Sequence, residues 1–171
     1  MRIIAGEFRG RRLKLPRARI RPTADRVKEA WFSILGAEVA GAMVADMFAG
    51  TGSLGLEALS RGARRVDFYE NSRTVQATLE RNIELLNVSD RVAMHRENAL
   101  RAALSLREGY YDVVLADPPY GKGYAEKLLQ VFLEHRFARR LCIEHSVGEL
   151  TGGDVRRRYG DTEISFFTAD V

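Results

Sequence analysis

Residues 43–55 read MVADMFAGTGSLG, a short apolar run that passes through a glycine-rich turn into a segment with helical character. The turn, Gly50 to Gly55, matches the pattern G-x-G-x-x-G. Glycines at these spacings let the backbone approach a ligand closely, and the first turn of the following helix offers free N–H groups. The pattern does not identify the ligand, because nicotinamide enzymes carry the same turn and a tight strand-to-helix turn can also lack a ligand.

Strands and helices alternate on both sides of this turn. Each apolar run of strand length is followed by a segment whose apolar residues recur at helical spacing. Such alternation predicts an α/β fold with a Rossmann-like, doubly wound and mostly parallel sheet, in which ligands bind beyond the carboxyl ends of the strands. The expected strands are 43–48, 66–70, 91–96, 111–116 and 139–144; the expected helices are 53–60, 72–87, 99–106 and 124–135, preceded by one that begins near Thr23 or Asp25.

The two ends of the chain depart from this alternation. Residues 2–5 and 12–15 predict a short hairpin at the N-terminus. At the other end, Gly152-Gly153, Tyr159-Gly160 and the apolar run from Ile164 predict a closing antiparallel hairpin. The connection between Glu144 and Gly152 is too short for a full crossover helix, so we expect the last link of the sheet to be trimmed.

Positive charge is concentrated near the N-terminus. Residues 1–28 hold ten lysines and arginines against two acidic residues, which gives this segment +8 and leaves −4 on the rest of a chain whose net charge is +4. A basic segment on an acidic body favours a polyanionic partner such as nucleic acid, although charge runs are also found on plain solvated surfaces. We treat 1–22 as a basic arm of the same domain as 23–171; the expected RNA contacts are Arg9, Arg11, Arg12, Lys14, Arg21 and Arg26.

Two carboxylates indicate what the glycine turn binds. Asp46 lies four residues before Gly50, where it would repel a pyrophosphate but attract a cationic ligand such as S-adenosylmethionine. Glu70 ends the second expected strand, 20 residues after Gly50, and is placed to accept hydrogen bonds from both hydroxyls of a ribose. A solvated charge at a strand end is the alternative for Glu70.

Glu97-Asn98-Ala99 follows the third expected strand, where the edge of an adenine ring would lie. Asn98 can donate and accept hydrogen bonds. It can equally cap the helix that starts at Ala99, and the two roles are compatible. The expected cofactor site therefore comprises Asp46, Phe48, Ala49, Gly50, Thr51, Gly52, Glu70, Asn71, Asn98 and Ala99.

Asp117-Pro118-Pro119-Tyr120 follows the fourth expected strand and is the most specific motif of the chain. Two prolines stiffen the backbone and remove its N–H donors, so carbonyl groups can be aimed at an incoming group. An exocyclic amine of a base is a poor nucleophile because its lone pair is delocalised. The Asp117 carboxylate and the Pro118 carbonyl can hold both amine hydrogens, and Tyr120 can stack on the base. These four residues are the expected catalytic residues; the alternative is a rigid surface turn.

Other kinds of site have little support. His95, His135 and His145 show no metal-ligand spacing, so we expect no metal. No apolar run approaches the roughly 20 residues that cross a bilayer, and the single cysteine, Cys142, lies in an apolar run typical of a buried side chain. The expected location is the cytoplasm, with no membrane partner.

Several motifs together resemble one family. They are Arg2-Ile3-Ile4-Ala5-Gly6 with Arg9-Gly10-Arg11, Arg21-Pro22-Thr23 with Asp25 to Glu29, Asp46 to Gly52 with Gly55 to Gly62, and the Asp117 turn. The chain is similar over nearly its whole length to the RsmD type of bacterial 16S ribosomal RNA guanine-N2 methyltransferases, which are class I enzymes dependent on S-adenosylmethionine. The resemblance implies methylation of one guanine in an assembled or assembling small subunit. It also implies that Thr23, otherwise a helix cap, approaches the methionine end of the cofactor; we expect a monomer.

Three other readings stay open. An RNA-binding assembly factor with a vestigial cofactor site would keep the basic arm, but the intact set of Asp46, Glu70 and Asp117 argues against it. A methyltransferase acting on adenine N6 or on a protein glutamine would use a similar turn; glutamine enzymes usually have asparagine at the position of Asp117. Many class I enzymes have aspartate where this chain has Asn98. A nicotinamide dehydrogenase is the most distant reading.

Overall fold

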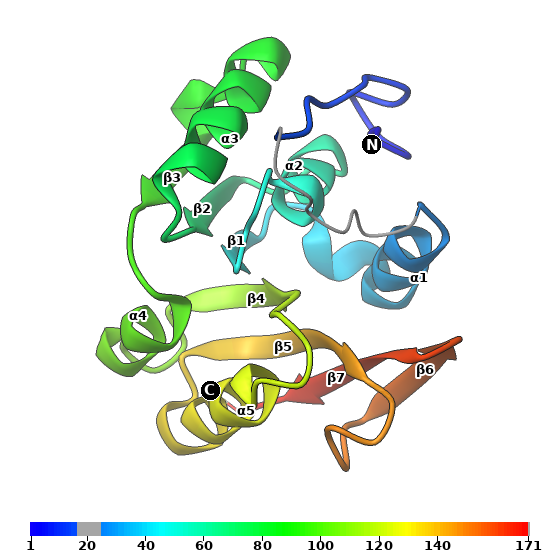
Figure 1. The fold of residues 1–171 in the computed structure, drawn as a ribbon, viewed down its shortest axis with the longest axis vertical. Coiled ribbons are helices and arrows are strands. Elements are labelled where there is room, and N and C mark those ends of the chain that lie inside the picture. The colour runs from blue at the N-terminus through cyan, green and yellow to red at the C-terminus, as the bar shows by residue number, and fades with distance from the viewer. Residues whose placement is uncertain (17–24, 171) are drawn as a thin grey trace.

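The computed structural model describes residues 1–16 and 25–170, and within them the chain forms one seven-stranded sheet in the order β3-β2-β1-β4-β5-β7-β6 (Figure 1). The first five strands of this order are parallel to one another, and β7 and β6 are antiparallel additions at one edge. The strands are β1 (Met43–Met47), β2 (Arg65–Tyr69), β3 (Val92–His95), β4 (Tyr111–Ala116), β5 (Ala138–Ser146), β6 (Val155–Tyr159) and β7 (Thr162–Thr168). The predicted doubly wound, mostly parallel sheet is confirmed.

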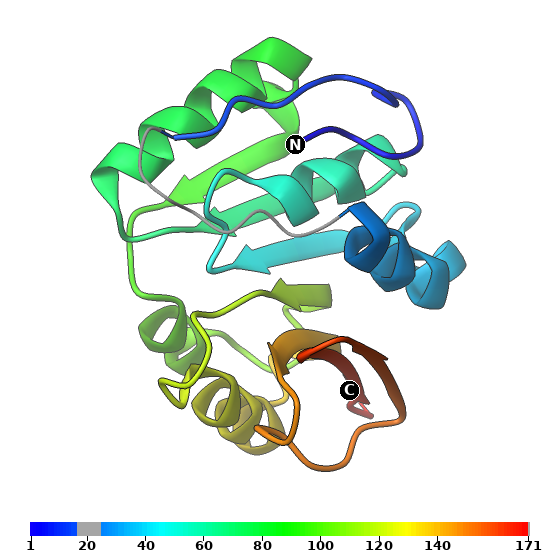
Figure 2. The ribbon, with the colours of Figure 1, turned by 45° about the vertical axis from the view of Figure 1, so that its right-hand side comes forward.

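Helices cover both faces of the sheet (Figures 1 and 2). Successive residues of a strand point to opposite faces, so Val44 packs with the helices of one layer and Ala45 with those of the other. Because both faces are buried, the parallel strands read as continuous apolar runs rather than alternating ones. One layer contains α1 (Asp25–Leu35), α2 (Ser53–Ser60) and α3 (Arg73–Leu86); the other contains α4 (Ala99–Ser105) and α5 (Tyr124–His135).

The N-terminal segment, residues 1–16, packs on α2 and α3 (Figure 2). Ile3 is fully buried and Leu13 nearly so, and both belong to the core beneath α2. The expected hairpin is present as a single antiparallel bridge between Arg2 and Arg12, with backbone hydrogen bonds on either side. The segment is therefore attached to the body by apolar burial as well as by polar contacts.

The carboxyl-terminal strands agree with the sequence pattern. β6 and β7 form the closing antiparallel hairpin, and residues 147–154 link β5 to β6 without a helix, as the short connection predicted. β7 pairs with β5 from Arg140↔Thr168 to Ser146↔Thr162. The turn between β6 and β7 therefore lies at the same edge of the sheet as the carboxyl end of β5.

Candidate active site

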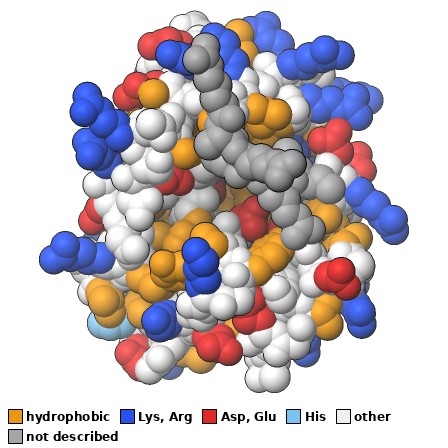
Figure 3. All heavy atoms as spheres, viewed as in Figure 1, with side chains coloured by type: hydrophobic (Ala, Val, Ile, Leu, Met, Phe, Trp, Pro, Cys, Tyr) orange, Lys and Arg blue, Asp and Glu red, His pale blue; other side chains and the backbone are white. Residues whose placement is uncertain are grey.

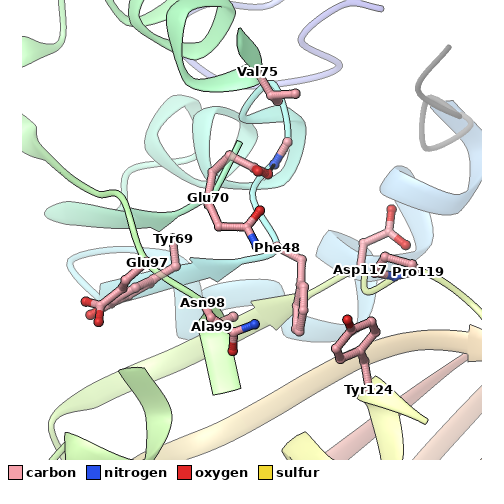
Figure 4. A pocket seen from close by; sticks show the side chains of 12 residues that line it. Phe48, Tyr69, Glu70, Val75, Glu97, Asn98, Ala99, Asp117, Pro119 and Tyr124 are labelled. Atoms are coloured by element: carbon pink, nitrogen blue, oxygen red, sulfur yellow. Dashed lines mark hydrogen bonds between the residues drawn. The ribbon is translucent and has the colours of Figure 1, made fainter. Parts of the chain in front are cut away.

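A cavity of about 250 Å³ lies at the carboxyl ends of β1, β2, β3 and β4 (Figure 4). Parallel strands bring their carboxyl ends to one edge, and the segments that follow the strands line the cavity. The lining residues are Phe48, Gly50, Tyr69, Glu70, Asn71, Val75, Glu97, Asn98, Ala99, Asp117, Pro119 and Tyr124. The structure therefore brings together six of the eleven residues expected at the cofactor and two of the four expected to be catalytic.

The turn after β1 is built from residues in the left-handed backbone region. Gly50 and Gly52 have φ of 56° and 85°, and the non-glycine Phe48 has φ of 62°. A non-glycine residue in this region costs on the order of 1–3 kcal/mol, and such residues cluster at ligand sites. A Cβ at Gly52 would lie 2.5 Å from the Leu79 side chain. These residues hold the turn close to α3 and present the Phe48 ring to the cavity.

Thr51, Gly52 and Ala49 lie behind the cavity rather than along it. Thr51 and Ala49 are buried, and the Thr51 carbonyl accepts a hydrogen bond from Asn82 Nδ2 at 3.0 Å. Gly55, the last glycine of the motif, serves packing: a Cβ there would lie 2.3 Å from the Phe68 ring on β2. The motif thus supplies both a ligand-facing backbone, at Gly50, and close contact between helix and sheet.

Asp46 lies beneath the glycine turn. Its carboxylate is 2% exposed, and Oδ2 accepts a hydrogen bond from the Gly55 N–H at 2.8 Å. Burial raises the pKa of Asp46 well above its ordinary value, and the negative charges of Asp117 and Glu70 raise that pKa further. The residue is a buried carboxyl group held by the start of α2 behind the cavity lining, and a cation in the cavity would stabilise its charged form.

Glu70 lines the cavity and also holds the glycine turn after β1. Its Oε2 accepts a hydrogen bond from the Gly50 N–H at 3.0 Å, and its Oε1 accepts one from the Ser72 N–H at 2.7 Å. A carboxylate oxygen has two lone-pair directions, so each oxygen retains one for a ligand hydroxyl. The two backbone contacts orient the carboxylate as a paired acceptor.

Asn98 caps α4, as the sequence allowed. Its Oδ1 accepts hydrogen bonds from the N–H groups of Leu100 and Arg101, at 3.0 and 3.2 Å. Because the oxygen is used by the cap, the Nδ2 group is the part of the side chain with hydrogen atoms to offer to a ligand. The adenine contact stays a prediction.

The loop after β4 forms the other side of the cavity. Asp117 and Pro119 lie across the Phe48 ring from Asn98 and Glu70 (Figure 4). Pro118 is buried. Tyr120 is half-buried outside the cavity lining, and its hydroxyl donates a hydrogen bond to Glu144.

Sequence reasoning missed the aromatic side chain beside this loop. Tyr124, at the start of α5, lines the cavity, and its ring centroid lies 5.6 Å from that of Phe48. Tyr69 and Val75 were also missed as lining residues, whereas Glu97 lies in the segment expected beside the adenine ring. The available signal for Tyr124 was its position four residues after Tyr120, at the start of an expected helix, which does not by itself show the direction of the ring.

The lining has the chemistry of a site for a cationic nucleoside. Glu70 offers paired acceptors for a ribose, Asn98 offers a donor, and Phe48 and Val75 offer apolar surface. Glu70, Glu97, Asp117 and the buried Asp46 surround this region with carboxylates, which favour a positive charge in the ligand. The residues present therefore fit S-adenosylmethionine better than a dinucleotide with a pyrophosphate.

The expected RNA contacts fall in two places. Arg9, Arg11 and Arg12 belong to the N-terminal segment, whose turn is held by Ser60 at the end of α2; Arg11 also donates to the carbonyl of Leu85 at 2.8 Å. This turn lies near the amino-terminal ends of the parallel strands, and the cavity lies at their carboxyl ends. Figure 3 shows Lys and Arg side chains around the outline of the molecule, including its upper part where the segment lies in Figure 1.

Arg26 forms the second place. Its guanidinium lies 5.8 Å from the ring centroid of Tyr159, which precedes the β6–β7 turn.

Lys14 belongs to the N-terminal segment. Its backbone N–H donates to Asn82 Oδ1, and its side chain is exposed to solvent. Thr23 and Arg21, and the boundary between 22 and 23, lie outside the described residues.

Residues 1–16 and 25–170 contain no group of three or more His, Cys, Asp or Glu side chains arranged to hold a metal ion. None of the helices in these residues is both long enough and apolar enough to cross a membrane.

Comparisons with known proteins identify the family. A family described as Conserved hypothetical protein 95 matches residues 1–146. Ribosomal RNA small subunit methyltransferase D of Haemophilus influenzae is 37% identical over 142 residues, which cover 81% of this chain and 74% of that one. The chain belongs to this RsmD-type methyltransferase family.

Solved structures agree with membership of the RsmD-type family. The Escherichia coli protein yhhF has a TM-score of 0.86 and 29% identity, covering 98% of this chain and 97% of that one. An RNA methyltransferase from Salinibacter ruber, solved in complex with S-adenosyl-L-homocysteine, has a TM-score of 0.70 at 16% identity, covering 86% and 93%. At that identity the likeness shows the shared fold, which is that of class I methyltransferases.

Proposed function

We propose that this RsmD-type protein transfers a methyl group from S-adenosylmethionine to the exocyclic N2 amine of one guanine in 16S ribosomal RNA. The observation that carries the proposal is the position of Asp117 and Pro119 on one side of a cavity whose other side carries Glu70 and Asn98. The Haemophilus influenzae relative, named as a ribosomal RNA small subunit methyltransferase, supports the choice of substrate.

The cofactor site divides by chemistry. Glu70 would accept hydrogen bonds from the ribose hydroxyls, while Asn98, Ala99 and Asn71 would contact the adenine. Phe48 and Gly50 would face the methionine end, backed by Ala49, Thr51, Gly52 and Asp46, with Thr23 as a further contact implied by the family. The cofactor supplies a methyl group on a cationic sulfonium, and the carboxylates around the cavity favour that charge.

The Asp117 loop prepares the amine. Its carboxylate and the Pro118 carbonyl would accept the two amine hydrogens, which turns the nitrogen lone pair toward the methyl group. The bound cofactor would supply the methyl group, and the amine nitrogen that receives it would then carry a positive charge. The Asp117 carboxylate would stabilise that charge and would accept the proton that the nitrogen releases.

The base must leave its stack to enter the cavity, at a cost of a few kcal/mol. Aromatic surface in the cavity offsets part of this cost, since stacking of a base on an aromatic ring contributes roughly 1–3 kcal/mol. Phe48 and Tyr124 line the cavity, and Tyr120 lies at the end of the loop. We assign base stacking to Tyr120, with Tyr124, which lines the cavity, as a second aromatic surface.

The remaining RNA contacts are electrostatic. Arg26, and Arg9, Arg11, Arg12 and Lys14 of the N-terminal segment, would bind phosphates, with Arg21 between them in sequence. Because the turn near Arg9 lies away from the cavity, the RNA surface would extend from the cavity across α2. A target of that extent suits a folded subunit. We further propose that the protein acts as a cytoplasmic monomer on an assembled or assembling small subunit.

The test is transfer of labelled methyl groups from S-adenosylmethionine to unmodified small subunits and to naked 16S RNA, followed by nucleoside analysis. N2-methylguanosine at one position in the subunit is the expected product. Label in N6-methyladenosine, in protein, or in no product would contradict the proposal.

A further inference from the structure

Tyr120, the last residue of the Asp117-Pro118-Pro119-Tyr120 turn, contacts β5 and β7, two strands that have no other part in the proposed reaction. We propose that Glu144, together with Thr162, is a positioning residue: it fixes the hydroxyl of Tyr120 and so holds the Asp117-Pro118-Pro119 turn in its working orientation. This inference rests on the proposed function and assigns part of that same site to β5 and β7.

Three segments far apart in sequence converge at this point. β4 and β5 are parallel, and Ala116, the last residue of β4, lies opposite Ile143. Glu144 is the next residue of β5 and is therefore level with the start of the loop that follows β4. β5 and β7 are antiparallel with Ser146 opposite Thr162, which brings the first residue of β7 to the same edge. The loop, β5 and the β6–β7 turn therefore meet at the carboxyl end of the sheet.

The contact itself is buried and polar. The Tyr120 hydroxyl donates to Glu144 Oε1 and lies 3.5 Å from Thr162 Oγ1. Glu144 is 4% exposed and Thr162 is 2% exposed. Burial, and then the hydrogen bond to Glu144, raise the pKa of Tyr120, so the phenol stays protonated and donates at any physiological pH.

The loop has a specific need for such an anchor. Pro118 and Pro119 have no N–H, so neither can donate a hydrogen bond that would tie the turn to a neighbouring strand. Tyr120 is the first residue after them, and its side chain provides the attachment. Misplacement of a reacting group by about 1 Å can lower a rate roughly a hundredfold. An anchor at Tyr120 therefore acts on the orientation of Asp117 without touching the cofactor.

The contact among Tyr120, Glu144 and Thr162 could instead serve only to attach the β6–β7 hairpin to the sheet. A control variant separates this structural role from positioning of the Asp117 loop. Ser165, on β7, exchanges a hydrogen bond of 2.8 Å with Nε2 of the buried His145 on β5. Ser165→Ala removes a buried polar contact between the same two strands without touching the loop.

The experiment measures single-turnover methyl transfer and cofactor affinity for Tyr120→Phe, Glu144→Ala, their double variant, Glu144→Gln and Ser165→Ala. Tyr120→Phe and Glu144→Ala should each lower the transfer rate by about ten- to a hundredfold. The double variant should lose no more than either single one. Cofactor affinity should change by less than about threefold. Glu144→Gln, which keeps an acceptor oxygen, should recover most of the rate, and Ser165→Ala should transfer at nearly the wild-type rate.

Additive losses in the double variant, an equal loss in Ser165→Ala, or a wild-type rate for Tyr120→Phe would overturn the inference. Nuclear magnetic resonance of protein labelled in its tyrosine rings supplies a readout that does not depend on substrate. The Tyr120 ring signal should be static in the wild type and averaged in Glu144→Ala; identical signals would overturn the anchor. If the wild type makes no N2-methylguanosine, the proposed function fails, while the ring signal still decides whether the anchor exists.

Discussion

Asp117 is the residue on which the proposed chemistry depends. It lines the cavity, and its carboxylate belongs to the group of negative charges near Asp46. Removing it takes away an acceptor for the amine and leaves the surface that would contact the adenosine intact. The two sides of the cavity can therefore be tested separately.

We expect Asp117→Ala to abolish methyl transfer while cofactor affinity stays within about tenfold, which corresponds to 1.4 kcal/mol. Isothermal titration calorimetry with S-adenosylmethionine and a labelled-transfer assay on small subunits measure the two quantities. Glu70→Ala is the matched variant, because it should lose cofactor affinity first. Parallel losses of binding and transfer in Asp117→Ala would show that its role is wrongly assigned.

Asp46 gives a prediction for the dependence on pH. Burial raises its pKa in the folded protein above the value in the unfolded chain. The folded state therefore holds this proton more tightly, so stability is lost as pH rises above the ordinary carboxyl range near 4. Asp46→Asn keeps an oxygen for the Gly55 N–H and removes the charge. Its melting temperature without ligand should exceed that of the wild type at pH 7.5, and the difference should shrink as the pH falls toward 4.5.

The same substitution should weaken binding of the cationic cofactor by tenfold or more, about 1.4 kcal/mol, because the attraction between opposite charges is lost. Calorimetry on the same preparations provides this measurement. A variant that gains no stability at pH 7.5 and binds the cofactor as tightly as the wild type would refute both the electrostatic role and the direction of the pKa shift.

At the scale of elements, α2 connects the cofactor turn to the N-terminal segment. Glu57 on α2 is fully buried and accepts hydrogen bonds from the backbone N–H groups of Ile4 and Ala5, at 2.8 and 3.0 Å. Lys28 on α1, also fully buried, places its Nζ 3.5 Å from the same carboxylate, and burial lowers the pKa of Lys28. One carboxylate thus joins the N-terminal segment, α1 and α2.

Glu57→Ala should lower the free energy of unfolding by about 3–5 kcal/mol, because it leaves Lys28 as a buried charge without its partner. Asp25→Ala breaks the exposed Arg2–Asp25 pair, of 2.9 Å, and should cost less than about 1 kcal/mol. Urea unfolding of both variants measures the contrast. Similar small losses in the two would mean that the segment is held mainly by Ile3 and Leu13.

At the scale of the whole molecule, the sequence predicted the architecture well because parallel strands buried on both faces give unbroken apolar runs. β4 was predicted at its observed bounds, and the turns after β1 and β4 were both expected at the sheet edge where the cavity lies. Local spacing sufficed for these features, since each strand end and its following turn are continuous in sequence.

Contacts between distant segments were not predictable in this way. The hydrogen bond of Tyr120 to Glu144 depends on the pairing of β4 with β5, and the burial of Ile3 depends on its packing against α2. The charge of the N-terminal segment indicated an exposed arm, whereas its apolar residues enter the core. Asp46 was expected beside the ligand, and its hydrogen bond to Gly55 places it behind the turn.

Binding of RNA is a property of the whole surface and gives a prediction at this scale. Arg9→Gln with Arg12→Gln should weaken binding to small-subunit RNA and reduce the steepness of its salt dependence, because fewer counterions are released. Lys127 and Arg139 are exposed on α5 and at the start of β5, so their double neutralisation is a control of equal charge. Filter binding across a range of salt concentrations measures both slopes. Equal slopes for the two double variants would show that the N-terminal segment does not contact RNA.

The central claim is that the cofactor lies between Glu70 and the Asp117 loop. A crystal structure with S-adenosyl-L-homocysteine tests it most directly. The account predicts that the ribose hydroxyls are bound by Glu70 and that the sulfur faces Asp117 and Pro119. A sulfur directed away from that loop, or a ligand bound outside the cavity, would contradict it.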